Sequence, residues 1–337
     1  MKKKIYNTIS ILGIFALTCI SGYSSNLTSK NQTIKDHTET YKSLFPDNSY
    51  NNGFDVSTTK EGIAALHGVL NYGGSVKGKP FWRIAQWNCY NNDIVSANYS
   101  FVNNMHNYSV GSIGNRITVD TKNNILVLEL NASTEYGKNG ITTNPRKNYE
   151  SWPTLLIDHE WTYDDCLKIA DKSEIRMNID YKVLKVIDKM PAGATNTTLH
   201  AAQFQWYITI QNRNTLSEDY GHFIWFGLSF YDNRHEYSPY YAAQDGGKES
   251  NTGAFIYTPD MKLILSSQGK AEVGKKFSVN ADILPIMKEA FALAQKRNYL
   301  TSSKWTDMYI GGTNIGWEVP GTYDVSVEIS KLNITYR

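Results

Sequence analysis

The chain of 337 residues has three cysteines and almost no excess of either charge, with 34 Lys and Arg against 32 Asp and Glu. Few cysteines exclude a disulfide-dense scaffold, and a near-neutral balance lacks the basic surface of a nucleic-acid-binding protein. The longest apolar run, at 9–20, is about a dozen residues, shorter than the ~20 of a membrane-spanning helix. We therefore expect neither a nucleic-acid partner nor a membrane span.

Motifs that would indicate a cofactor site or a catalytic nucleophile are also missing. The sequence has no glycine-rich phosphate loop, no Cys/His zinc spacing and no nucleophile elbow, and His159-Glu160 lacks a second histidine one helical turn later. We expect no cofactor. A structural calcium ion held by loop aspartates stays open, because sequence does not locate such a site.

The first residues have the three parts of a secretory signal in the right order. Lys2–Lys4 are basic, Ile9–Ile20 are apolar, and small residues follow, so residues 1–25 predict export and an extracytoplasmic location, secreted or attached to the envelope. Cys19 resembles the lipid-modified cysteine of a bacterial lipoprotein, although Thr18 stands where a smaller residue is usual, so a lipid anchor stays open. Removing the three lysines changes the formal charge from +2 to −1.

The remainder divides into a polar segment, 26–60, that we interpret as a tether, and one domain, 61–337. From 61 onward apolar residues mostly alternate with polar ones, which is typical of strands with one buried face. Cys89 and Cys166 either form one disulfide or stay free, and the sequence does not fix the oligomeric state. The clearest predicted strands are 124–131, 152–161, 174–187, 200–211, 222–232, 254–257 and 323–336.

One amphipathic helix is predicted at 283–294, with Asp282 as its cap, and a second short one at Thr58, where Glu61 would close a capping box. The longer helix should pack across an end or edge of the strands. Without an internal repeat or a break in composition, the pattern favours a mostly β protein, a single antiparallel β-sandwich with one or two peripheral helices.

Strand alternation sorts side chains into a core face and an open face. In 200–211 the even positions are apolar, which leaves Gln203, Gln205 and Tyr207 on the open face; in 222–232 the same rule leaves Trp225 and Tyr231 there. His200 and His222 fall on the core side. The outward carboxylates of other strands are Asp158, Glu160 and Glu129.

Amides, carboxylates and flat aromatics on one face suit a sugar, because pyranose rings stack on aromatic rings and their hydroxyls need paired donors and acceptors. The 23 Tyr and 8 Trp agree with this, although any single aromatic is more often structural. We therefore predict a polysaccharide or glycan as the ligand. The predicted binding residues are Gln203, Gln205, Tyr207, Trp225, Tyr231, Arg234 and Glu318.

In this pattern residues 75–337 resemble the concanavalin A-like and jelly-roll sandwiches of secreted bacterial carbohydrate-active proteins. The resemblance implies a glycan groove on a concave sheet, in binding modules as well as in hydrolases and lyases. Neither the paired-carboxylate signature of laminarinase-like hydrolases nor the short motifs of jelly-roll alginate lyases is present, so the resemblance implies a ligand class and no activity.

Two alternatives to a binding module stay open. A polysaccharide-cleaving enzyme would draw acid–base residues from Glu160, Asp158, Glu129 and Tyr207, since a glycoside hydrolase needs two carboxylates and a lyase needs a base near the sugar. A structural or adhesive surface protein would need none of them. For each carboxylate a surface role is the commoner outcome.

Two segments without strand alternation are predicted to be loops. The segment 233–251 is long and rich in aromatics, and we interpret it as a wall or lid over the groove. The glycine-rich segment 305–321 is expected to lead into the final strand with Trp317 packed inward. Glu318 would then be either a buried structural partner or a carboxylate in the groove.

Overall fold

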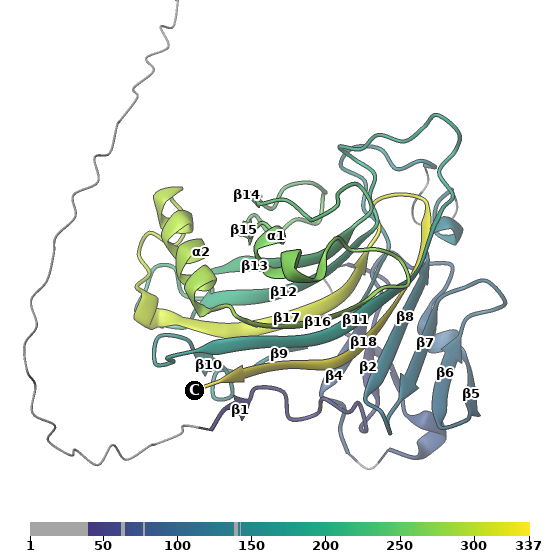
Figure 1. Cartoon of the computed structure of the whole chain (residues 1–337), viewed down its shortest axis with the longest axis horizontal. Helices are drawn as coiled ribbons and strands as arrows, with labels where there is room; N and C mark the ends of the chain where they lie inside the picture. Colours follow the sequence, from purple (N-terminus) through teal and green to yellow (C-terminus); the bar gives the residue numbers. More distant parts are fainter. Residues whose placement is uncertain (1–39, 62–64, 77, 138–140, 142) are drawn as a thin grey trace, which may run out of the picture. The chain divides into compact units, whose positions relative to one another are not determined.

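The computed structural model describes residues 40–337 except 62–64, 77, 138–140 and 142. The predicted signal, Cys19 and the tether up to residue 39 lie outside these residues. The described chain is mostly β, and its strands form two stacked sheets in a jelly-roll sandwich (Figure 1). The predicted fold class is confirmed.

Sheet A has eight strands. Their order across the sheet is β16 (Lys276–Asp282), β11 (Ile175–Asp188), β18 (Tyr323–Tyr336), β8 (Ile125–Asn131), β7 (Arg116–Asp120), β6 (Met105–Ser109) and β5 (Asn98–Val102), with β1 (Lys42–Ser43) paired to β18. All of these pairs are antiparallel.

Sheet B has ten strands and holds most of the predicted site. Their order is β14 (Tyr241–Gln244), β15 (Phe255–Thr258), β13 (Phe223–Asp232), β12 (Gln203–Asn212), β17 (Met308–Glu318), β9 (Thr154–Glu160), β4 (Trp82–Ala85), β2 (Phe54–Ser57) and β3 (Leu66–Leu70), with β10 (Leu167–Lys168) on β17. The pairs β13–β15 and β2–β4 are parallel. The sequence predicted a purely antiparallel sandwich, so this expectation is wrong for sheet B.

The core lies between the sheets and follows the predicted alternation. On β12, Phe204, Trp206 and Ile208 are fully buried. Tyr181 of β11 joins the two sheets, because its ring centroid lies 5.5 Å from that of Phe204 and 5.1 Å from that of Phe230 on β13. All seven predicted strands are present, with ends that differ by at most a few residues.

The predicted helix is α2 (Leu284–Lys296), which packs against β13, and its buried side chains include Met287, Phe291 and Ala294. The N-cap position is Ile283 rather than the predicted Asp282, although Asp282 Oδ1 accepts the Leu284 backbone N–H at 3.1 Å. A short helix α1 (Lys262–Leu265) was not expected. Single 3₁₀ turns are η1 (Tyr72–Gly74), η2 (Ile94–Ser96), η3 (Ala132–Thr134), η4 (Ser266–Gln268) and η5 (Trp305–Asp307).

Several sequence expectations need correction. The segment 40–60, assigned to the tether, contains β1 and β2 and therefore contributes to both sheets. Residues 58–61 form no helix, and 62–64 lie outside the described residues. His222 is exposed rather than on the core side, because β13 begins only at the next residue and alternation does not extend to it. His200 is buried as expected.

The glycine-rich segment 305–321 is not a loop. Most of it is β17, an eleven-residue strand at the centre of sheet B between β12 and β9. Trp317 is fully buried, as predicted. Cys89 and Cys166 are free thiols, so the disulfide alternative is not realised. No helix in the described part of the chain is long and apolar enough to cross a membrane.

Candidate functional site

The open face of sheet B, turned away from sheet A, carries side chains from five neighbouring strands in register. One row across it, which we call the Trp225 row, contains Glu160 (β9), Gly312 (β17), Thr209 (β12) and Trp225 (β13). Neighbouring positions in such a row are about 4.8 Å apart. The sheet therefore places a carboxylate, a hydroxyl and an indole along one line.

Gly312 leaves a gap in the middle of this row. A Cβ atom added there would make ordinary contacts with Thr209 Oγ1 at 3.4 Å and Glu160 Cγ at 3.6 Å, so these two side chains flank the glycine without a clash. Glu160 on one side is exposed, and Thr209 and Trp225 on the other are partly exposed. Gly312 therefore lies between a carboxylate on one side and a hydroxyl and an indole on the other.

An aromatic cluster borders the gap. The ring of Trp225 packs edge-to-face against Tyr207 at 5.9 Å and Phe223 at 5.0 Å, and its indole N–H donates to Thr252 Oγ1 at 3.0 Å. The Tyr207 hydroxyl donates to Gln205 Oε1 at 2.9 Å, and burial raises the pKa of Tyr207. Gln205 is itself buried, so it orients Tyr207 rather than presenting its own amide.

The next row contains an ion pair that the sequence interpretation did not include. Arg83 of β4 donates from Nε to Asp158 Oδ1 at 2.8 Å and from Nη2 to Oδ2 at 2.5 Å. Burial raises the pKa of Asp158, which the guanidinium only partly offsets. Alternation within 82–85 would have placed Arg83 outward, so a signal for it existed. Asn314 follows in the same row, and its Oδ1 is buried without a partner in the described residues.

Glu318 lies at the far end of β17, opposite Gln203 of β12 and Thr154 of β9. Burial raises the pKa of Glu318, and Lys248 acts in the opposite direction. A carboxyl group with a raised pKa keeps its proton to higher pH, which is the property of a general acid.

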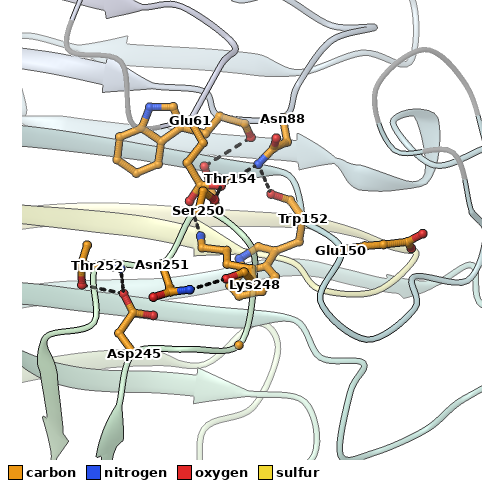
Figure 2. A network of polar contacts seen from close by, with 12 residues as sticks. Glu61, Asn88, Glu150, Trp152, Thr154, Asp245, Lys248, Ser250, Asn251 and Thr252 are labelled. Carbon is orange, nitrogen blue, oxygen red and sulfur yellow. Dashed lines mark hydrogen bonds and ion pairs between the residues drawn. The ribbon is translucent and has the colours of Figure 1, made fainter.

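A second polar cluster fastens the segment between β14 and β15 beside Glu318. Lys248 forms an ion pair with Glu61, its amine lies 4.2 Å from the ring centroid of Trp152, and Ser250 Oγ donates to Glu61 Oε2 at 2.7 Å (Figure 2). We call Lys248, Glu61 and Trp152 the Lys248 clasp. The side chains of Lys248 and Glu61 are each 12% exposed, so the contact is largely shielded from water.

The segment 233–251, predicted to be a wall or lid, is thus partly regular structure. It contains β14, which extends sheet B, and then the clasp residue Lys248. Asp245 stabilises the same turn by accepting from the N–H and the hydroxyl of Thr252. Thr252, the residue after the segment, also accepts the indole N–H of Trp225, so Asp245 is linked to the open face through Thr252.

The remaining predicted residues, Arg234, Gln203, Tyr231 and Glu129, lie outside the Trp225 row. Arg234 is held by Asp232, at 2.8 and 2.6 Å, and Gln203 donates to the same carboxylate at 2.9 Å. Tyr231 is not on the open face as predicted, because a register shift next to Phe204 sets it opposite that core residue, and it packs against the buried ring of Trp317. Glu129 lies on β8 of sheet A, where it pairs with Lys185 at 2.7 Å. The structure therefore does not bring Glu129 together with Asp158 and Glu160.

Within the described residues, no group of three or more His, Cys, Asp or Glu side chains is arranged to hold a metal ion. Asp158, Asp232 and Glu61 are each engaged by a cationic side chain.

No family model matches the chain, and no curated protein matches it. Among solved structures it is similar to a mutant cellulase derived from that of Rhodothermus marinus, with 8% identity, 76% of this chain and 100% of the other covered, and a TM-score of 0.38. A family 12 xyloglucanase from Bacillus licheniformis in complex with ligand has 13% identity, coverages of 72% and 97%, and a TM-score of 0.39. The xyloglucanase domain of NopAA from Sinorhizobium fredii, in complex with cellobiose, has 8% identity, coverages of 72% and 96%, and a TM-score of 0.34.

The Lys248 clasp should contribute measurably to stability. Lys248→Met keeps much of the side-chain volume but leaves Glu61 without its cation. We expect a loss of about 1–2 kcal/mol, less than for a fully buried pair because each side chain keeps a small exposed fraction. Adding Glu61→Gln should restore part of the loss. Thermal melting of both single variants and the double variant measures this coupling, and strictly additive effects would contradict it.

Proposed function

We propose that the protein is an exported carbohydrate-binding protein that holds a polysaccharide or glycan across the open face of sheet B. The observation that carries the proposal is the Trp225 row, in which Gly312 leaves room between an exposed carboxylate and an aromatic cluster. A pyranose ring over Gly312 would contact Trp225 with its C–H groups and Thr209 and Glu160 with its hydroxyls. The signal-like residues 1–25 support the extracytoplasmic location.

Among the carboxylates predicted from the sequence, the arrangement of Glu318, Asp158 and Glu160 favours binding over cleavage. Inverting glycosidases place two carboxyl groups about 6.5–9.5 Å apart, and retaining ones about 5–5.5 Å. Glu318 and Glu160 are separated by six positions of the register, about 20 Å along the strands. Asp158 and Glu160 are about 7 Å apart on one strand, but the bidentate pair with Arg83 occupies both oxygens of Asp158.

Cleavage of the same polymer is the second candidate function, and the raised pKa of Glu318 is the observation that favours it. A hydrolase or lyase would release new reducing ends, and a lyase would also produce the ultraviolet absorbance of an unsaturated uronate. Incubation with a panel of neutral and acidic polysaccharides separates these outcomes. Product release that is lost in Glu160→Gln or Glu318→Gln would establish an enzyme.

Affinity gel electrophoresis tests the binding function directly. Gels containing one soluble polysaccharide each, covering xyloglucan, mixed-linkage β-glucan, xylan, mannan and alginate, should retard the protein in at least one case. An unrelated protein of similar size is the control for sieving. Unchanged mobility in every gel, together with no released product, would favour the third interpretation, a structural or adhesive surface protein.

Glu318 gives a pH-dependent prediction. Its pKa is raised in the folded protein, so its contribution to stability is present below the unfolded pKa and is lost as the pH rises through the folded value. Glu318→Gln removes this loss and should therefore melt higher than the wild type near pH 8, with a smaller difference near pH 4. Melting curves across this range provide the measurement.

If the difference in melting temperature between Glu318→Gln and the wild type shrinks as the pH rises, Lys248 stabilises the carboxylate of Glu318 instead. The same variant also separates the two roles of Glu318. Reduced glycan retention by the folded variant indicates a carboxylate that contacts the ligand, whereas unchanged retention indicates a structural one.

A further inference from the structure

An open groove of about 750 Å³ lies on the outer face of sheet A, over β16, β11 and β18. The groove is unusual in composition, because six of its ten lining residues are asparagines. The lining residues are Tyr41, Asn48, Asn123, Asn124, Arg176, Asn178, Asn280, Lys331, Asn333 and Thr335.

Three of the asparagines form a row across the floor. Asn178 of β11 is in register with Asn280 of β16 on one side and with Asn333 of β18 on the other. Adjacent strands place these amides about 4.8 Å apart, close to the length of one pyranose unit in an extended chain. Asn123 and Asn124, in the turn between β7 and β8, and Asn48, which follows β1, supply further amides beside the row.

The amides of the row keep hydrogen-bonding capacity. Asn280 Oδ1 accepts from Arg176 Nε at 2.6 Å, Asn333 Oδ1 accepts from Ser43 Oγ at 2.9 Å, and Asn178 Nδ2 donates to Thr335 Oγ1 at 3.2 Å. Across the described part of the chain, no side-chain hydrogen bond uses Asn280 Nδ2, Asn333 Nδ2 or Asn178 Oδ1. The free atoms of the row thus alternate donor, acceptor, donor across the floor. The same three amides are held in place by the hydrogen bonds that their other atoms make.

Each of the two cations of the groove is paired with a carboxylate that it shares with a second cation. Arg176 and Arg337 pair with Glu174, and Lys331 and Lys276 pair with Asp180. A ligand with many hydroxyl groups matches the alternating donors and acceptors of the floor, because each amide can both donate to and accept from hydroxyls. Tyr41, 41% exposed, adds an aromatic side chain at the rim.

We propose that this groove is a second carbohydrate-binding site, which takes a polyhydroxylated chain, on the sheet opposite to the Trp225 row. The proposal goes beyond the function of sheet B and depends on different residues. Two sites on opposite faces would allow one protein to engage two segments of a polymer, so retention by a polysaccharide would exceed the affinity for a short oligosaccharide.

The test uses ¹⁵N-labelled protein carrying Trp225→Ala, so that the contact proposed on sheet B is removed. Cellohexaose, xylohexaose and mannohexaose are titrated separately, and the side-chain amide signals of Asn178, Asn280 and Asn333 are followed. At least one sugar should shift these signals saturably. Adding Asn178→Ala should weaken that binding about tenfold, the effect of one or two lost hydrogen bonds.

Asn98→Ala is the matched control, because Asn98 is an exposed asparagine on β5 of the same sheet, outside the groove. Asn333→Ala repeats the test if Asn178→Ala melts early. Absence of saturable shifts with all three sugars, or equal binding after the groove substitutions, would overturn the proposal. Failure of the sheet B site would be seen in a different measurement: polysaccharide gels would retain Trp225→Ala as strongly as they retain the wild type.

Discussion

Trp225→Ala is expected to weaken glycan binding about thirtyfold while leaving the melting temperature nearly unchanged. A stacked aromatic at the centre of a binding surface typically contributes about 2 kcal/mol or more, which corresponds to this factor. Trp225 is only partly buried, and its ring contacts are confined to the open face, so the core between the sheets is not affected. Affinity electrophoresis with the polysaccharide that retards the wild type measures the loss.

Phe101→Ala provides the matched control, because Phe101 is 56% exposed on β5, at the far edge of sheet A. It should lose a comparable aromatic surface without losing retention. If Trp225→Ala is retained as strongly as the wild type, the Trp225 row is not the binding surface. If both variants lose retention equally, binding depends on general surface hydrophobicity.

The architecture was predictable where one physical signal dominates. Strands such as β12 bury one face completely, so period-two alternation identified both the strand and the side on which Phe204 and Trp206 lie. The same rule correctly placed Tyr207 and Trp225 away from the core. It failed at His222, one residue before β13 begins, because alternation carries information only within a strand.

The candidate site was predictable only in part, because its contacts join residues far apart in the sequence. Glu61 and Lys248 meet across 187 positions, and Arg83 meets Asp158 across 75. Each residue alone has the character of an ordinary surface charge. Only the order of strands in sheet B, in which β4 lies beside β9, brings Arg83 to Asp158 and thereby removes Asp158 from the set of free carboxylates.

The segment 305–321 was misassigned because glycine has two structural meanings. Glycines usually mark turns, but in a strand they also mark places where another backbone comes close. At Gly316 the second meaning applies: φ is +154°, and a Cβ atom would lie 2.3 Å from the carbonyl oxygen of Leu155 on β9. The glycine is therefore what allows β17 to pair with β9 at the centre of the sheet.

Gly316→Ala is accordingly expected to destabilise the protein by about 4 kcal/mol, the combined cost of an unfavourable backbone conformation and of a steric clash. The clash cannot be relieved by a side-chain rotation, because the atoms nearest to the new methyl group belong to the backbone of Leu155 and Leu156. The melting temperature should fall by about 10 °C.

Gly312→Ala in the same strand is the control, since its Cβ would make only ordinary contacts from 3.4 Å outward. Its stability should equal or exceed that of the wild type, because glycine is unfavourable within a strand. The two glycines thus have different roles. Gly316 permits the central strand pairing, whereas Gly312 keeps side-chain atoms out of the middle of the Trp225 row. Gly312→Ala should therefore reduce glycan retention in a fully folded protein. Equal melting temperatures for the two variants would refute the steric role of Gly316.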